Sequence, residues 1–324
     1  MTALRFVLRI GLMFGLLVAP LAAEAEQAEK SPRIGLLEYA PFWGEPLREG
    51  LRDLGYVEGQ NVSFVYRPSE GRSERLPELA SELVRLNVDV IVAYGTPATR
   101  AAKQATATVP IVMLGIGDPV RTGLAHSLGR PGGNVTGNST LGPDVWSKRL
   151  QLLREAFPRV SRVAFLWNPV NASNTVAFQE AKVGAQALRM TLQSVEVSSP
   201  DRFESAFVVM RKELPDALLM TADQMHLLHV DRVVDFAARN RLPAMYQVKG
   251  NVMIGGLMSY GASLPHLFRD GARYIDKILK GAKPADLPVE QATTFEFVIN
   301  MKTAKALSLK IPPSVLAQAD EVIQ

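Results

Sequence analysis

The hydrophobic residues of this chain form short continuous runs, separated by stretches in which apolar positions recur every three or four residues. A continuous run indicates a buried strand, and the wider spacing indicates an amphipathic helix. In the first part of the chain, strands are predicted at residues 33–38, 61–67, 88–94 and 110–114, and one of the intervening helices at residues 76–84. Buried strands that alternate with helices are typical of a parallel sheet covered on both faces.

The same alternation starts again near residue 146. A second set of strands is predicted at residues 162–167, 192–197, 216–220 and 243–247, with helices beside and between them. After residue 252 the chain adds an extended segment, a long helix, and a last strand and helix. We therefore predict an α/β fold with two doubly wound parallel-sheet lobes.

The first 25 residues do not fit this alternation. Arg5 and Arg9 precede an apolar run at residues 10–21, and Ala23 and Ala25 are small residues at the two positions that a signal peptidase reads. The apolar run is shorter than the ~20 residues that cross a bilayer. We expect a signal peptide at residues 1–25 and a mature protein in the periplasm. The sequence has no cysteine, so we expect no lipid anchor on an N-terminal cysteine.

Composition and charge narrow the functional classes. The hydrophobic content of 47% is that of a globular protein, and roughly 300 residues after a signal peptide suit two lobes. The net charge is only +4, and no long basic run occurs, so we expect no nucleic-acid partner. Without cysteine, disulfides, thiolate metal sites and cysteine nucleophiles are excluded.

Two segments of the chain resemble each other. Residues 89–96 (DVIVAYGT) align with residues 216–223 (DALLMTAD), and each segment is followed by a helix and then by a strand that opens on proline. If the two halves are equivalent, Thr96 and Asp223 lie at the carboxyl ends of equivalent strands, where open α/β sheets bind ligands. The alternative is a chance likeness between two βα units.

Several short motifs occur along the chain in a fixed order. They are LRDLGYVEGQN at 51–61, VIVAYGTPA at 90–98, RPGGNVTG at 130–137, LPAMY at 242–246, GGLMSYG at 255–261 and KILKGAKPADLP at 277–288. In order and spacing they resemble the ABC transporter substrate-binding protein family, whose characterised members include tryptophan- and tyrosine-binding proteins. The resemblance covers nearly all of the chain after the expected signal peptide.

The resemblance implies the type I periplasmic binding fold, in which three chain crossings join the lobes. We expect the crossings near residues 137–139, 250–252 and 289–291. The first lobe would then comprise residues 31–138 and 252–289, and the second lobe residues 139–251 and 290–324.

The resemblance also implies a function. The protein would capture a small solute, such as an aromatic amino acid, between two closing lobes and deliver it to the permease subunits of an ABC importer. We expect it to act as a monomer. The alternative is a periplasmic hydrolase-like enzyme on the same fold.

A cleft for a small zwitterion needs donors for a carboxylate, acceptors for an ammonium group and an apolar wall. Gly95, Thr96 and Pro97 form a strand-to-helix turn whose free N–H groups and hydroxyl suit a carboxylate. Asp223 is a candidate ammonium acceptor. Thr96 and Asp223 could instead be simple helix caps. Asp118 follows a strand and is a further candidate, or the centre of a turn that bonds its own backbone.

Other candidates for ligand contact are a polar residue and four aromatic ones. Asn168 follows the strand at 162–167. Tyr39, Phe42 and Trp43 follow the first strand and could form a stacking wall, or pack beneath the next helix. Tyr260 could close the cleft from the hinge side, or pack within the hinge.

Patterns for catalysis and cofactors are incomplete. Gly115 and Gly117 lack the third glycine of a dinucleotide fingerprint, and the chain has no Walker A lysine motif. His226 and His229 have no neighbouring pattern of metal ligands. Ser259 lacks the flanking glycines of a nucleophile elbow. We therefore expect a protein without cofactor, metal or catalytic residues.

Overall fold

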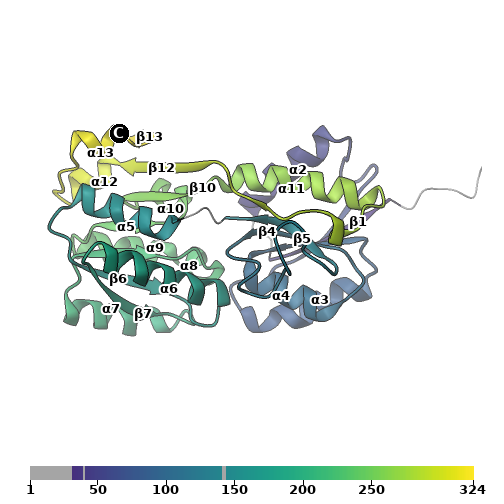
Figure 1. The fold of residues 1–324 in the computed structure, drawn as a ribbon, viewed down its shortest axis with the longest axis horizontal. Helices are drawn as coiled ribbons and strands as arrows, with labels where there is room; N and C mark the ends of the chain where they lie inside the picture. Colours follow the sequence, from purple (N-terminus) through teal and green to yellow (C-terminus); the bar gives the residue numbers. More distant parts are fainter. Residues whose placement is uncertain (1–30, 39–40, 141–143) are drawn as a thin grey trace, which may run out of the picture.

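The computed structural model describes residues 31–38, 41–140 and 144–324, with the side chains of residues 41–43 left aside. Two sheets with helices on both faces form two lobes, which lie side by side along the long axis of the molecule (Figure 1). This architecture confirms the predicted fold class. The expected signal peptide at residues 1–25 lies outside the described residues. Within the described part of the chain, no helix is long and apolar enough to cross a membrane.

The first lobe contains a six-stranded sheet in the order β11-β5-β4-β3-β1-β2. Its elements are β1 (Arg33–Leu37), α2 (Pro41–Asp53), β2 (Ser63–Arg67), η1 (Ser73–Arg75), α3 (Leu76–Arg85), β3 (Val90–Tyr94), α4 (Gly95–Ala105), β4 (Ile111–Ile116), β5 (Val135–Ser139), α11 (Leu264–Leu279), η2 (Pro284–Asp286) and β11 (Glu290–Gln291). Every residue of β3 is buried, as its continuous apolar sequence predicts.

The second lobe contains a seven-stranded sheet in the order β13-β12-β10-β9-β8-β6-β7. Its elements are α5 (Val145–Ala156), β6 (Arg162–Trp167), α6 (Ala172–Ala187), β7 (Thr191–Glu196), α7 (Arg202–Glu213), β8 (Ala217–Met220), α8 (Gln224–Leu228), α9 (Val230–Arg239), β9 (Ala244–Tyr246), α10 (Lys249–Met253), β10 (Met258–Ala262), β12 (Phe295–Asn300), α12 (Met301–Ala306), α13 (Pro313–Leu316) and β13 (Glu321–Ile323). Among these strands, β10 and β12 are antiparallel neighbours.

The two lobes repeat one topology. The first sheet contains the order β2-β1-β3-β4-β5, and the second contains the matching order β7-β6-β8-β9-β10. In this alignment β3 corresponds to β8, so the likeness between residues 89–96 and 216–223 reflects equivalent strands. After each fifth strand the chain changes lobe: α5 packs in the second lobe, and α11 packs on α2 in the first.

One expected crossing is wrong. We expected the chain to enter the first lobe near residues 250–252, but α10 and β10 belong to the second lobe. The reason is pairing, because β10 is hydrogen-bonded between β9 and β12 as the fifth strand of the second repeat. The crossing lies at Ser263, between β10 and α11. The other two crossings, between β5 and α5 and between β11 and β12, directly follow their expected positions.

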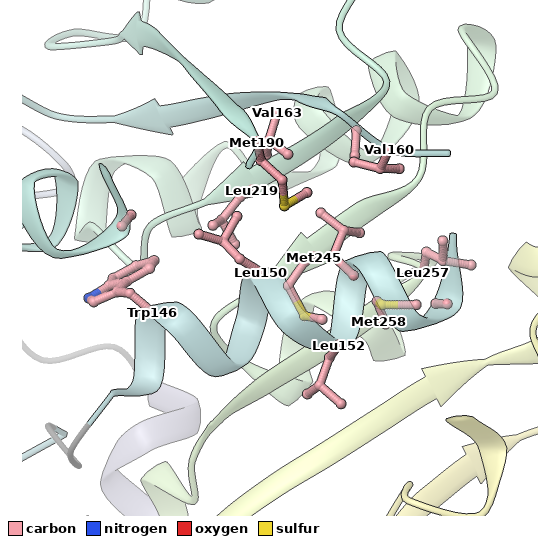
Figure 2. Packing of buried hydrophobic residues seen from close by; sticks show 14 of the residues in the cluster. Trp146, Leu150, Leu152, Val160, Val163, Met190, Leu219, Met245, Leu257 and Met258 are labelled. Carbon is pink, nitrogen blue, oxygen red and sulfur yellow. The ribbon is translucent and has the colours of Figure 1, made fainter. Parts of the chain in front are cut away.

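The core of the second lobe places the start of α5 beside the junction of the lobes. Leu150 of α5 is fully buried in a cluster with side chains of the central strands, among them Leu219 and Met245 (Figure 2). Leu153 of the same helix is fully buried in this cluster as well. Full burial of one such side chain contributes about 1.5–3 kcal/mol. This packing fixes α5, and Trp146 at its first turn then faces the space between the lobes.

Candidate functional site

A cavity lies between the two sheets, at the carboxyl ends of their strands. The first lobe lines it with residues that follow β1, β3 and β4, among them Glu38, Thr96 and Asp118. The second lobe lines it with residues such as Ser173 of α6 and Asp223, which follows β8. Open α/β sheets bind ligands at this edge because the strand ends there present loops and helix N-termini.

The turn between β3 and α4 supplies a buried hydroxyl. Gly95 has φ +78°, a conformation that glycine adopts without strain and that leads the chain directly into the helix. The N-cap position of α4 is occupied by Tyr94, and Thr96, the second residue of the helix, is 3% exposed. The Thr96 hydroxyl lies 2.6 Å from the Ser173 hydroxyl in the other lobe. Thr96, Pro97 and Ser173 all line the cavity, so this turn is a point of contact between the lobes.

Asp118 has two roles in the structure. One of its carboxylate oxygens accepts the backbone N–H groups of Val120 and Arg121, both at 2.9 Å. This is the backbone-bonded turn that the sequence analysis gave as the alternative to ligand contact, although Asp118 also lines the cavity. The following Arg121 forms an ion pair with Glu180 of α6 at 2.7 Å, which joins the lobes beside the cavity.

Asp223 is the centre of a buried polar network in the second lobe. It is 3% exposed and accepts the side-chain N–H groups of Asn168 at 3.2 Å and Asn171 at 2.8 Å. It also caps α8 by accepting the Met225 N–H at 3.1 Å. Asn168 does not line the cavity and acts here by orienting Asp223. Among the described residues, no lysine or arginine forms an ion pair with Asp223, and the groups that bond it are neutral N–H donors.

A second buried carboxylate faces the same space. Glu38 follows β1, is 5% exposed, and accepts bonds from the hydroxyl and the N–H of Ser69. Burial raises the pKa of Glu38; the Ser69 bonds and Arg75 oppose this shift, and the charge of Asp223 adds to it. Two acids that influence each other across one cavity favour a cationic group between them.

The cavity also contains a buried cation. Arg149 of α5 is 1% exposed, and its Nε donates to the Tyr260 backbone oxygen at 2.6 Å. Its guanidinium carbon lies 4.2 Å from the centre of the Trp146 ring. Burial lowers the pKa of Arg149 to about 9, which leaves the group charged at neutral pH. The closed site therefore combines both signs of charge with an aromatic surface.

The expected aromatic wall is only partly described. Tyr39 and the side chains of Phe42 and Trp43 lie outside the described residues. Tyr260 does not line the cavity, and its ring stacks on Phe295 with centroids 5.8 Å apart. Its backbone oxygen accepts the hydrogen bond from Arg149, which does line the cavity. Among the described side chains, the aromatic ones that line the cavity are those of Tyr94 and Trp146.

Sequence analysis missed several residues of the site. Residues that line the cavity and were not predicted include Glu38, Tyr94, Trp146, Arg149, Asn171, Ser173 and Gln247. A signal for one of them was present, because Arg149 is spaced three residues after Trp146 and four before Leu153 on the apolar stripe of its helix. A charged residue on such a stripe is unusual. Among the described residues, no group of three or more histidines and acids could hold a metal ion.

Comparison with known proteins identifies a family and relatives. Residues 44–323 match the family described as "ABC transporter substrate binding protein". The chain is 27% identical to a tyrosine-binding protein of Clostridioides difficile over 263 residues, 81% of this chain and 75% of the relative. Two solved structures cover 90% and 91% of the chain and are themselves covered completely. One is a conserved domain protein from Vibrio cholerae, at 28% identity and a TM-score of 0.86. The other is an ABC domain from Streptococcus pneumoniae in complex with L-Trp, at 30% identity and a TM-score of 0.85.

Proposed function

The chain belongs to the ABC transporter substrate-binding protein family, and from this premise we propose that it is the periplasmic solute-binding component of an ABC importer. Its family consists of substrate-binding proteins rather than enzymes. The proposed solute is an aromatic amino acid. One relative is named for tyrosine binding and another was solved with L-Trp.

The observation that carries the proposal is the cavity between the lobes. Buried side chains of both lobes line it, including acids in each lobe and an arginine in the second. An ammonium group would be accepted by Asp223 with Glu38 nearby, and the hydroxyls of Thr96 and Ser173 are available as further polar contacts. The ring of Tyr94, which is 8% exposed, would contribute part of the apolar wall.

Capture by closure follows from where these groups lie. A solute that touches both lobes binds the closed state better than the open one, and this difference in affinity shifts the equilibrium toward closure. The permease subunits would then recognise the closed form. Direct contacts between Thr96 and Ser173 and between Arg121 and Glu180 support a closed state that is complementary across the cleft.

Export and assembly complete the proposal. The sequence of residues 1–25 favours a cleaved signal peptide and a periplasmic location. The mature protein would act as a monomer, with the permease subunits as its protein partners.

A ligand screen tests the function. The chain from residue 26 onward, purified and freed of bound solute, is heated with aromatic amino acids, other amino acids, aromatic acids and nucleosides. A ligand that binds only the folded state raises the melting temperature, by an amount that grows with its concentration relative to Kd. We expect the aromatic amino acids to give the largest shifts. If another class does so, the proposed solute is wrong.

A pair of variants links binding to the cavity. Asp223→Asn keeps the size of the side chain but removes the charge that would accept the ammonium group. We expect it to weaken binding by about 10- to 100-fold, as loss of a charged hydrogen bond does. Asp235→Asn removes a carboxylate from an exposed position on α9 and should leave affinity unchanged.

Mass spectrometry of the ligand released from the protein distinguishes a binding protein from an enzyme. We expect the ligand to be chemically unaltered, and turnover of the ligand would indicate an enzyme.

A further inference from the structure

Arg149 is buried at a position where the fold itself needs an apolar side chain. It lies on the buried face of α5 with Trp146, Leu150 and Leu153, and its exposed fraction is 1%. An arginine is almost never this buried unless a charge or several acceptors compensate it. The question is therefore what compensates Arg149.

The protein supplies only part of that compensation. Nε donates to the Tyr260 backbone oxygen, and one face of the guanidinium lies on the Trp146 ring. Nη1 is buried and has no hydrogen-bond partner among the described residues. No carboxylate forms an ion pair with Arg149 in the described part of the chain. A guanidinium has five N–H donors, so most of its bonding capacity is left for another group.

The position of the guanidinium indicates where that group sits. Arg149 lines the cavity between the lobes, and the bond to Tyr260 fixes the plane of the guanidinium through Nε. The Nη atoms are then the donors that remain for a group bound in the cavity. A carboxylate matches two parallel N–H donors in shape and charge, and it would remove the cost of an uncompensated buried cation.

The acids that line the cavity are not that partner. Asp118 accepts the backbone N–H groups of its own turn, and Glu180 pairs with Arg121. Asp223 is held by Asn168, Asn171 and the N-terminus of α8, and Glu38 by Ser69 on the first lobe. Both signs of charge are therefore present in one cavity without neutralising each other directly. A solute with a cationic and an anionic group would pair with both.

We propose that Arg149 is the anion anchor of the cavity and restricts the captured solute to compounds that carry a carboxylate. This inference rests on the proposed solute-binding function and assigns a specificity-determining residue to it. Arg149 selects by charge and by the shape of its two donors, while Asp223 and Glu38 select for the amine.

The first test compares ligands on the unaltered protein, so that folding of a variant is not in question. Affinities are measured by calorimetry for L-tryptophan and L-tyrosine and for the corresponding carboxamides, which keep the ring and the amine but lose the anionic group. We expect the amides to bind about 10- to 100-fold more weakly. Equal affinities for acid and amide would overturn the anchor and leave solute capture intact.

The second test changes the residue. Arg149→Gln should abolish the preference for acid over amide, and Arg149→Lys, which keeps the charge but not the paired donors, should retain part of it. Arg154→Gln removes an exposed arginine from the same helix and should behave as the unaltered protein. A preference for the acid that persists in Arg149→Gln would overturn the proposal.

A third measurement separates this inference from the proposed ligand. If no aromatic amino acid binds, the proposed solute is wrong, and the anchor is then tested with indole-3-propionate and its amide at millimolar concentration and constant ionic strength. Greater thermal stabilisation by the acid in the unaltered protein, but not in Arg149→Gln, would support the anchor. The same stabilisation by acid and amide would overturn it.

Discussion

Gly117 lies at a close approach between the two lobes. It follows β4 in the first lobe and lies against Ser173 of α6 in the second. A Cβ atom at position 117 would lie 2.9 Å from the Cβ of Ser173 and nearer still to its hydroxyl oxygen. The backbone of Gly117 is not in the left-handed region, so alanine is acceptable there within the first lobe. Gly117→Ala therefore perturbs the closed state selectively.

The magnitude follows from the missing space. Carbon atoms pack at about 3.5–4.0 Å, so the contact is short by about 0.6–1.1 Å. The Ser173 hydroxyl can rotate away, but its Cβ moves only with α6. Overpacking of this kind costs about 1–3 kcal/mol, and the open state does not experience it. Since the cost applies to closure alone, ligand affinity should fall about 5- to 150-fold.

The assay is ligand affinity by calorimetry, together with thermal unfolding of the ligand-free protein. Gly117→Ala should lose affinity without a matching loss of ligand-free stability. Ser173→Gly, which removes the clashing atoms, should restore most of the affinity in the double variant, whereas Ser173→Ala keeps the Cβ and should not. Unchanged affinity in Gly117→Ala would refute the closed arrangement. A loss that Ser173→Gly fails to relieve would place the effect within the first lobe.

Three further outcomes are expected. Because the folded-state pKa of Glu38 is raised, the folded protein binds a proton on this carboxylate more tightly than the unfolded chain does. The charged carboxylate therefore lowers the stability of the fold at high pH, and this cost is removed as the pH falls through the folded pKa toward 4.5. Glu38→Gln should thus be more stable than the unaltered protein at pH 7 in urea unfolding, an advantage that shrinks as the pH falls toward 4.5; a constant difference would contradict the shift. Arg121→Gln removes the half-exposed pair with Glu180 and should weaken ligand binding only about twofold, with a smaller effect at high salt in titrations at two ionic strengths. Gly137 has φ +135°, and a Cβ there would collide with the backbone of Met113, so Gly137→Ala should lower unfolding stability by about 3 kcal/mol, and an unchanged melting temperature would argue against this register of β4 and β5.

Local pattern was sufficient for much of the fold. The continuous apolar strands, such as β3, and the helical stripes predicted two doubly wound units because both signals depend only on residues near in sequence. The likeness of residues 89–96 and 216–223 also placed Thr96 and Asp223 correctly at equivalent strand ends. Both residues line the cavity, although their role as ligand contacts stays a prediction.

Pairing between distant segments was beyond the local pattern. The extended segment that contains β10 fits either lobe by its sequence, and its place was decided by hydrogen bonds to β9 and β12. Tyr260 illustrates the same limit, since pairing with Phe297 turns its ring toward Phe295 and away from the cavity.

The sequence alone determined the layers of each lobe and the edge of each sheet at which a site could form, because strand ends follow from chain direction. Tertiary structure decided which groups meet across that edge. Thr96 and Ser173 are 77 positions apart and touch only because the lobes close, and Arg149 faces the cavity only because α5 crosses into the second lobe after β5. Burial then determines what these side chains contribute to binding, since an unpaired charge costs much free energy where water is excluded.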